Sequence, residues 1–245
     1  FLQSSLEKTY ELYLLLLLLI AELQDAAIER IEAGRLKQQP TKEDLHPNTK
    51  FVNNKPLRVI TKSKELAKEA ANRKLGWGQE QDLIKRLFKS LVASEEYLAY
   101  MANEERGFQH DRESLNRMFR KHIVNDEGLQ EWIEEQSILW SDDLDLASSI
   151  VLKTVKTIAE DSDDVLLSDM WKEDGDDRQF LEDLYSKSLD LAGEHDALIE
   201  EAASNWDLER IATMDLLLLR MALSEARSFP SIPLKVTMNE YIDLA

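Results

Sequence analysis

The sequence predicts an all-α protein, a helical bundle, and three observations support this prediction. The chain of 245 residues contains only 7 glycines and 5 prolines, well below the average usage of about 7% Gly and about 5% Pro. No proline occurs between residues 57 and 229, as expected for consecutive helices joined by short turns. Charged residues make up 32% and hydrophobic residues 43%, which suits helices with one buried and one solvated face. Turn-rich β-sandwiches and barrels are disfavoured.

Prolines and polar segments divide the chain into expected helices. Residues 38–55 form a polar connector that contains Pro40 and Pro47, and residues 160–177 form an acidic one. Between and around these connectors, apolar residues recur at helical spacing. Helices are expected near residues 4–35, 57–75, 80–103, 111–123, 127–137, 142–160, 177–203, 207–227 and from 237 onward.

The first expected helix contains an uninterrupted apolar run. Residues 12–21 are all apolar and lie between Glu11 and Glu22. A helix that spans a bilayer needs about 20 apolar residues, and this run supplies half of them. We therefore expect a buried core helix and no association with a membrane.

Two later helices have recognisable start signals. Ser141 is followed by Asp142 and Asp143, and carboxylates favour the positive end of the helix dipole. Thr237 and Glu240 match a capping box, in which the Thr hydroxyl accepts an amide and the Glu side chain reaches back. We therefore expect helices to begin at these positions, with Asn239 and Glu240 as capping and orienting residues.

The formal net charge of −18 is unevenly distributed. Residues 1–100 carry 16 basic and 14 acidic groups, whereas residues 141–245 carry 9 basic and 25 acidic groups. Residues 50–74 contain eight basic groups and only two acidic ones. In this segment Arg58 and Lys62 lie one helical turn apart, as do Lys64 and Lys68. They form either an RNA-phosphate-binding ridge or a solvated helix face.

The sequence offers little catalytic chemistry. It has no cysteine, which removes disulfides and thiolate zinc sites and fits a reducing compartment. No phosphate-binding glycine loop or nucleophile motif is present. The acidic turns at 161–164 and 174–177 lack the glycine and glutamate of a calcium loop. The residues therefore give little catalytic signal, and we predict no cofactor and no metal.

The last 40 residues carry a specific order of features. The order is a Trp, an acidic-basic pair, an Asp, a Leu-Arg-x-Ala motif with a Glu, a Pro-x-Lys-Val loop, and an Asn-Glu pair. These are Trp206, Glu209, Arg210, Asp215, Leu219, Arg220, Ala222, Glu225, Pro233, Lys235, Val236, Asn239 and Glu240. This order resembles the NusB family of transcription antitermination factors, and residues 180–199 look like the family's long central helix.

The resemblance implies a non-enzymatic role with two partners. NusB-like proteins pair with the ribosomal protein NusE and bind boxA-type RNA. Together they form part of an RNA polymerase antitermination complex in the bacterial cytoplasm, notably on ribosomal RNA genes. Glu209 and Asp215 match acidic positions on the NusE-facing surface, where they would complement a basic partner.

Other motif positions are expected to be structural. Arg220 lies five positions from both Asp215 and Glu225, so its ion-pair partner is expected elsewhere in the fold. Glu225, Asn239 and Glu240 are expected to hold the fold together.

The resemblance also implies a domain organisation. Residues 1–140 are expected to form an N-terminal helical extension, and 141–245 a C-terminal region that contains the NusB-like core, 177–245. Residues 12–20 and 41–49 look like the enlarged version of the family in Bacteroidetes-type bacteria. The family's arginine-rich first helix and its last helix would lie outside Phe1 and Ala245, so the chain is expected to be truncated at both ends.

Three alternatives remain at this stage. A NusB-like domain also occurs as the RNA-binding module of RNA methyltransferases. A helical protein-interaction scaffold could keep the fold without binding RNA. A hydrolase would use His110-Asp111 and His195-Asp196, although neither pair has the spacing of a metal site.

Overall fold

The computed structural model describes residues 2–169, 171, 175–202 and 210–244. All regular structure in these residues is helical, with fourteen α-helices, one π-helical turn and no strand. The predicted all-α fold is confirmed. The chain divides into two compact units, Phe1–Met170 and Trp171–Ala245, which we call unit 1 and unit 2 and describe separately.

Unit 1 is built from ten α-helices and the π-helical turn, counted over its described residues. They are α1 (Leu2–Arg35), α2 (Lys42–Leu45), α3 (Lys55–Thr61), α4 (Lys64–Arg73), α5 (Gln81–Ala93), α6 (Glu95–Ala102), α7 (Phe108–Met118), η1 (Phe119–Ile123), α8 (Glu127–Gln136), α9 (Ile138–Ser141) and α10 (Leu144–Thr157).

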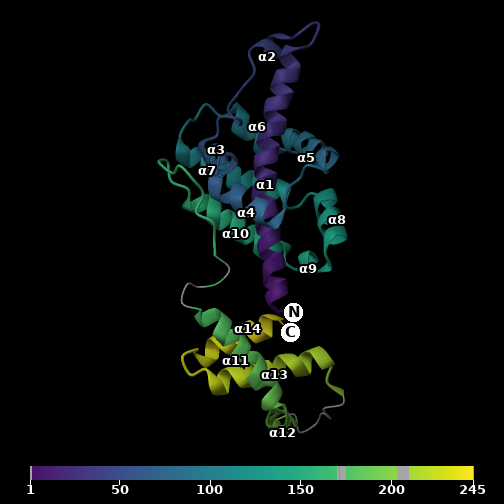
Figure 1. Ribbon diagram of the computed structural model, residues 1–245, viewed down its shortest axis with the longest axis vertical. Coiled ribbons are helices and arrows are strands. Elements are labelled where there is room, and N and C mark those ends of the chain that lie inside the picture. Colours follow the sequence, from purple (N-terminus) through teal and green to yellow (C-terminus); the bar gives the residue numbers. More distant parts are fainter. Residues whose placement is uncertain (1, 170, 172–174, 203–209, 245) are drawn as a thin grey trace. The chain divides into compact units, whose positions relative to one another are not determined.

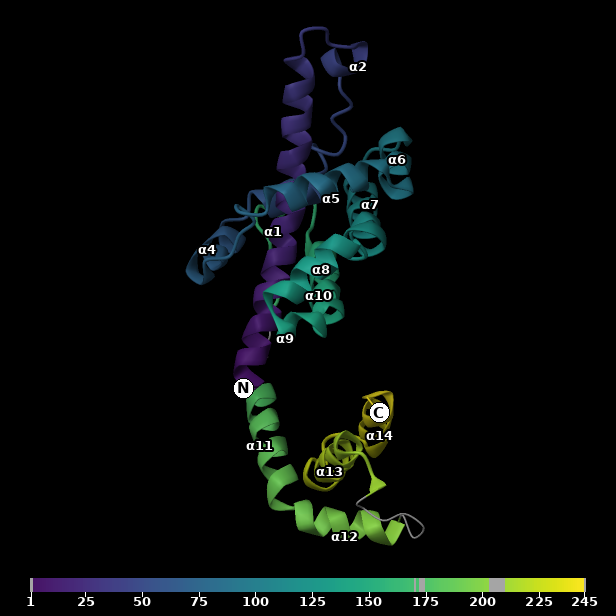
Figure 2. The same cartoon turned by 90° about the vertical axis from the view of Figure 1, so that its right-hand side faces the viewer.

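Helix α1 is the centre of unit 1. It contacts α2, α3, α4, α5, α9 and α10, which surround it in Figures 1 and 2. Leu14, Leu16, Leu17 and Leu19 have no exposed surface, although they point in different directions around the helix. A helix that is apolar on all sides must be enclosed on all sides, so the predicted buried core helix is confirmed.

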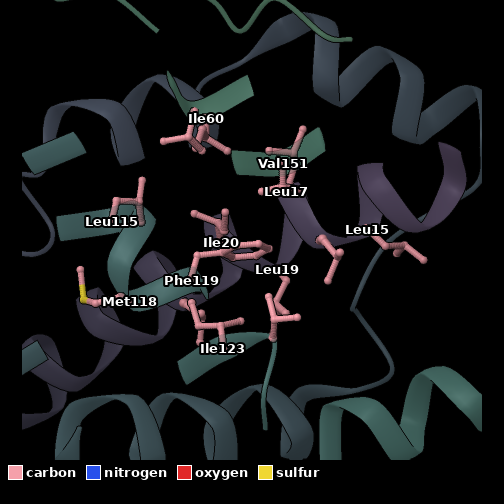
Figure 3. Packing of buried hydrophobic residues seen from close by; sticks show 14 of the residues in the cluster. Leu15, Leu17, Leu19, Ile20, Ile60, Leu115, Met118, Phe119, Ile123 and Val151 are labelled. Atoms are coloured by element: carbon pink, nitrogen blue, oxygen red, sulfur yellow. The ribbon is translucent and has the colours of Figure 1, made fainter. Parts of the chain in front are cut away.

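The core extends from α1 to the helices that enclose it. Figure 3 shows Leu17 and Ile20 of α1 packed with side chains from α3, α7, η1 and α10. The indole Nε1 of Trp77 donates to the carbonyl of Leu15 at 2.9 Å. The hydroxyl of Tyr13 lies 2.9 Å from that of Thr154 on α10. The buried polar atoms of Trp77 and Tyr13 are therefore satisfied within the core.

None of the helices in the described part of the chain is long and apolar enough to cross a membrane.

The expected helix at 57–75 is in fact two helices. The chain turns after α3, and the hydroxyl of Ser63 accepts the amide of Leu66 at 3.0 Å to begin α4. The Asp164 carboxylate accepts from the Ser63 hydroxyl and from the amide of Lys64. Burial alone would raise the pKa of Asp164, but these hydrogen bonds hold it below its usual value. A residue of the acidic connector thus helps to cap α4.

Two further expectations in unit 1 need correction. The helix expected at 80–103 breaks at Ser94, whose hydroxyl accepts the amide of Tyr97 at 3.2 Å and so begins α6. The helix expected at 111–123 begins earlier, at Phe108, and ends in a π-helical turn. The amide of Val124 donates to the carbonyl of Phe119, and this wider turn leaves Phe119 and Ile123 both buried.

Unit 2 is a small helical bundle. Its described helices are α11 (Asp176–Asp190), α12 (Ala192–Ala202), α13 (Thr213–Ser228) and α14 (Leu234–Leu244). Helix α13 contacts each of the other three, so it is the central element of this unit.

The expected boundaries in unit 2 also shift. The helix expected at 177–203 breaks at Leu191, and the redirected α12 buries His195 and Ile199. The helix expected at 207–227 begins at Thr213, because residues 210–212 are described and are not α-helical. Positions 207–209 lie outside the described residues.

The capping box expected at Thr237 is wrong. Helix α14 begins at Leu234, and the amide of Val236 donates to the carbonyl of Pro233 at 2.8 Å. Thr237 is therefore inside the helix, where its hydroxyl donates to Glu225 instead of accepting an amide. Proline is favoured at helix starts because it has no amide to satisfy.

The helix start expected at Ser141 is also wrong. Ser141 ends α9, and α10 begins at Leu144 after Asp143. The Asp143 carboxylate accepts from the hydroxyl of Thr9 at 2.5 Å. This carboxylate therefore joins α1 to the start of α10, and its side chain does not cap the helix.

His195 is the most buried titratable side chain of α12. It has no exposed surface, and its Nδ1 lies 3.4 Å from the hydroxyl of Ser224 on α13. Its Nε2 has no hydrogen-bond partner among the described residues. Burial, together with the positive charge of Arg227, lowers the pKa of His195 below its usual value of 6.5.

We predict that Leu17→Ala destabilises unit 1 by about 2–5 kcal/mol, because it leaves a cavity beside α1. The matched control is Leu36→Ala, since Leu36 is 84% exposed and should change the free energy of unfolding by less than about 0.5 kcal/mol. Urea unfolding followed by circular dichroism measures both. Equal effects of the two substitutions would contradict the central position of Leu17.

We also predict that unit 2 loses stability as pH falls below about 6.5. With its pKa lowered in the fold, His195 binds a proton more readily in the unfolded chain. Neutral His195 therefore contributes its full stabilisation above the pKa that it has in the unfolded chain. This contribution is lost as pH falls from that value through the lower pKa that His195 has in the folded protein. Hydrogen exchange of residues 192–202, corrected for the intrinsic effect of pH, should show this loss. His195→Gln should flatten the response, whereas His46→Gln, at an exposed histidine, should leave it unchanged.

Candidate functional site

Glu225 joins the last two helices of unit 2. Its carboxylate accepts from the hydroxyl of Thr237 at 2.7 Å and from that of Tyr241 at 3.3 Å, both on α14. Burial and the nearby carboxylate raise the pKa of Tyr241 to about 12, so the phenol stays a hydrogen-bond donor. Glu225 itself is buried. Glu225 therefore has a structural role, because its hydrogen bonds hold α14 against α13.

Arg220 makes the corresponding connection between α13 and α12. Its Nε and Nη2 donate to the two carboxylate oxygens of Asp196, both at 2.8 Å. This is the planar, two-bond geometry that the guanidinium favours. The pair holds the pKa of the Asp196 carboxyl below its usual value. Asp196 is therefore the ion-pair partner of Arg220, which was expected elsewhere in the fold than Asp215 and Glu225.

Asn239 and Glu240 are exposed on α14. They lie well inside the helix and cannot cap its start, so the capping role expected for them is wrong. On the same helix Leu234, Met238 and Ile242 follow one another at four-residue spacing. All three are also exposed, with 67% of the surface of Ile242 accessible. Helix α14 therefore presents both polar and apolar groups outside the unit.

Asp215 lies in the first turn of α13 and is exposed. A carboxylate there interacts favourably with the helix dipole. Its neighbours Met214 and Leu217 are also exposed, Met214 by 66%. Glu209, the second acidic residue expected at this surface, lies outside the described residues. What the structure shows here is an acidic group beside apolar side chains, which suits a basic protein partner with apolar contacts.

All four basic residues expected to bind RNA are exposed. Arg58 lies in α3 and Lys62 is its C-cap, whereas Lys64 and Lys68 lie in α4. The turn at Ser63 separates the two pairs, so the single continuous helix expected to carry them is wrong. Within the described residues none of the four forms an ion pair. Each ammonium or guanidinium group is thus available to an anion.

The histidines of the hydrolase hypothesis have structural contacts. His110 stacks on Tyr100 with ring centroids 5.6 Å apart, and its Nε2 lies 3.4 Å from the Nζ of Lys50. That Nζ also donates to the carbonyls of Tyr100 and Asn103, and burial lowers the pKa of Lys50. The second histidine of this hypothesis, His195, belongs to unit 2, where it is buried beside Ser224. Among the described residues no three His, Asp or Glu side chains are arranged to hold a metal.

The structural roles of Asp164, Asp196 and Lys50 were not predicted from the sequence, although all three lie in segments considered there for other reasons. Each makes its main contacts with residues far away in the chain, such as Ser63, Arg220 and Tyr100. No local pattern could have identified them.

Comparison with known proteins gives a match in the second part of the chain. Residues 143–245 match the NusB family model. This range begins before α10, which packs in unit 1, and includes all of unit 2. The expected domain boundary after residue 140 and the narrower core 177–245 stay predictions.

Several curated relatives have the same name. Transcription antitermination protein NusB of Salinibacter ruber is 42% identical over 73 residues, which are 30% of this chain and 46% of that protein. The proteins of this name from Agathobacter rectalis and Natranaerobius thermophilus are each 36% identical, over 29% and 27% of this chain and 53% and 48% of their own. The chain spans about half the length of the curated relatives it matches. No solved structure matches it. The C-terminal part of this chain, residues 143–245, is thus similar to the NusB family, in its match to the family model and in its identity to these relatives.

Proposed function

We propose that this protein is a non-enzymatic transcription antitermination factor. It pairs with the ribosomal protein NusE and binds boxA-type RNA, so that RNA polymerase reads through terminators, notably in ribosomal RNA genes. The observation that carries the proposal is the family match at residues 143–245, together with relatives named as antitermination proteins. This role places the protein in the cytoplasm.

The acidic surface of α13 supports the NusE part of the proposal. Asp215 is exposed beside Met214 and Leu217, and residues 141–245 carry 25 acidic against 9 basic groups. Charge of this sign steers a basic ribosomal protein toward the surface. The apolar side chains would then be buried in the complex. Glu209 is proposed to contribute from the segment that precedes α13.

The basic residues of α3 and α4 support the RNA part. Arg58, Lys62, Lys64 and Lys68 are exposed and unpaired within the described residues. A cation that contacts a phosphate releases a condensed counterion, which favours binding and makes it depend on salt. We propose that these two pairs contact the RNA backbone and do not read the sequence of boxA.

A protein-interaction scaffold without RNA binding is the second candidate. It is favoured by the apolar stripe of α14, formed by Leu234, Met238 and Ile242, which is exposed in unit 2. Both candidates require a protein partner, and they differ in whether RNA strengthens the complex.

The first test is a titration of the protein with boxA-type RNA, with and without NusE. We predict that NusE raises the RNA affinity and that Asp215→Lys weakens the complex with NusE by about tenfold, because it opposes a basic partner. Asp190→Lys is the matched control, since Asp190 is exposed on α11 and the charge change is the same. No gain in RNA affinity on adding NusE would contradict the antitermination role and favour the scaffold.

The second test concerns the basic pairs. We predict that Arg58→Glu with Lys62→Glu, and Lys64→Glu with Lys68→Glu, each lower RNA affinity and reduce its dependence on salt. Lys153→Glu with Lys156→Glu makes the same change in charge at exposed positions of α10 and serves as control. RNA affinity is measured by fluorescence anisotropy at several salt concentrations. If it is unchanged in both test variants, the proposed contact with the RNA backbone is contradicted.

A further inference from the structure

A groove in unit 1 lies outside the residues that match the NusB family. Residues of α1 and α5 line it, and it has a volume of about 500 Å³. Figure 2 shows that these two helices cross. One face of each helix lines the groove, because the residues on each helix recur at spacings of three and four. They are Ala26, Glu29, Arg30 and Ala33 of α1, and Lys85, Phe88, Lys89, Val92 and Ala93 of α5.

The floor of the groove is apolar and made of short side chains. Ala26, Ala33 and Ala93 leave room for another backbone to approach closely. Phe88 and Val92 line this groove and also line a second hollow of about 310 Å³. The two hollows therefore share apolar side chains beside α1, although Glu43 and Asp44 also line the second one. Apolar surface of this kind gains most from burial against leucine-like side chains.

The rim of the groove is positively charged. Arg30, Lys85 and Lys89 are exposed, and none of them pairs with a carboxylate within the described part of the chain. Their neighbour Arg86, by contrast, donates to Asp126 at 2.7 Å. Glu29 is the single acidic residue among those lining the groove. In a chain with 48 acidic and 30 basic residues, an apolar groove bordered by three unpaired cations is selective for a negatively charged occupant.

We propose that this groove binds an acidic amphipathic helix of a partner protein. The apolar side of that helix would occupy the floor, and its carboxylates would pair with Arg30, Lys85 and Lys89. The arrangement is less suited to a nucleic acid. Bases stack on exposed aromatic faces, whereas Phe88 is only 6% exposed. The site lies in the N-terminal part of the chain and does not depend on NusE or boxA RNA.

The probe is a synthetic, dye-labelled helix of about five turns. It has leucines at positions i, i+3, i+4 and i+7 and glutamates on its other faces. One control peptide has lysines in place of the glutamates, and another has serines in place of the leucines. Fluorescence anisotropy with the full chain measures the affinity of each. The glutamate-leucine helix should bind most tightly, because it alone matches both the floor and the rim.

Two variants of the protein locate the site. Lys85→Glu with Lys89→Glu should weaken binding by at least about tenfold, and Ala33→Trp should do the same without any change in charge, because the indole would fill the groove. Both changes are at exposed positions, so folding should be preserved, and circular dichroism checks this. The matched charge control, Lys153→Glu with Lys156→Glu on α10, should bind as the unchanged protein does.

The proposal is overturned if the glutamate-leucine helix does not bind, or if the lysine or serine peptide binds equally well. It is also overturned if the groove variants bind as tightly as the α10 control, since the peptide would then occupy another surface. Oligouridylate in place of the peptide tests the nucleic-acid alternative. The groove would be assigned to a polyanion instead under two conditions together. The protein would bind oligouridylate but not the acidic helix, and Lys85→Glu with Lys89→Glu would abolish the binding of oligouridylate.

Discussion

Burial of α1 on all sides is the constraint on which unit 1 depends. Within residues 12–20 of α1 every side chain except that of Leu18 is buried, so other helices must cover the whole circumference of this segment. Each covering helix needs only one apolar face, and its other face is left for solvent or partners. Helices α3, α4 and α5 cover α1 in this way. The basic residues of α3 and α4 and the groove beside α5 therefore owe their positions to α1.

Unit 2 depends more on buried polar contacts than unit 1 does. Among the described residues its buried apolar side chains are Leu184 and Ile199, whereas His195, Ser224, Glu225 and Thr237 are buried polar ones. A buried hydrogen bond adds only about 1 kcal/mol net, but losing one partner leaves the other unsatisfied at a cost of about 1–3 kcal/mol. Such contacts specify one arrangement of α12, α13 and α14. They leave many apolar side chains of α13 and α14 exposed and so available to a partner.

The sequence predicted what depends on local pattern. An apolar run without charges identified the core helix at residues 12–21, and the scarcity of Gly and Pro identified the all-α fold. The ends of helices were harder to predict, because Ser63 caps the start of α4 directly after α3 ends, with help from Asp164, about a hundred residues away. The Thr237–Glu240 pattern matched a capping box, yet that helix begins at Leu234, directly after Pro233. The partner of Arg220 and the groove of α1 and α5 depend on tertiary packing, which no spacing along the chain encodes.

The distribution of charge is more informative than its total. A net charge of −18 suggests repulsion of every anion, but charges separated by more than about 10 Å are largely screened at moderate salt. Binding is therefore decided by the groups within one surface. In unit 1 unpaired cations gather on α3 and α4 and around the groove of α1 and α5, whereas in unit 2 Asp215 lies exposed at the start of α13. One acidic chain can thus favour anionic partners at one part and a basic protein at the other, and each surface can be altered without changing the other.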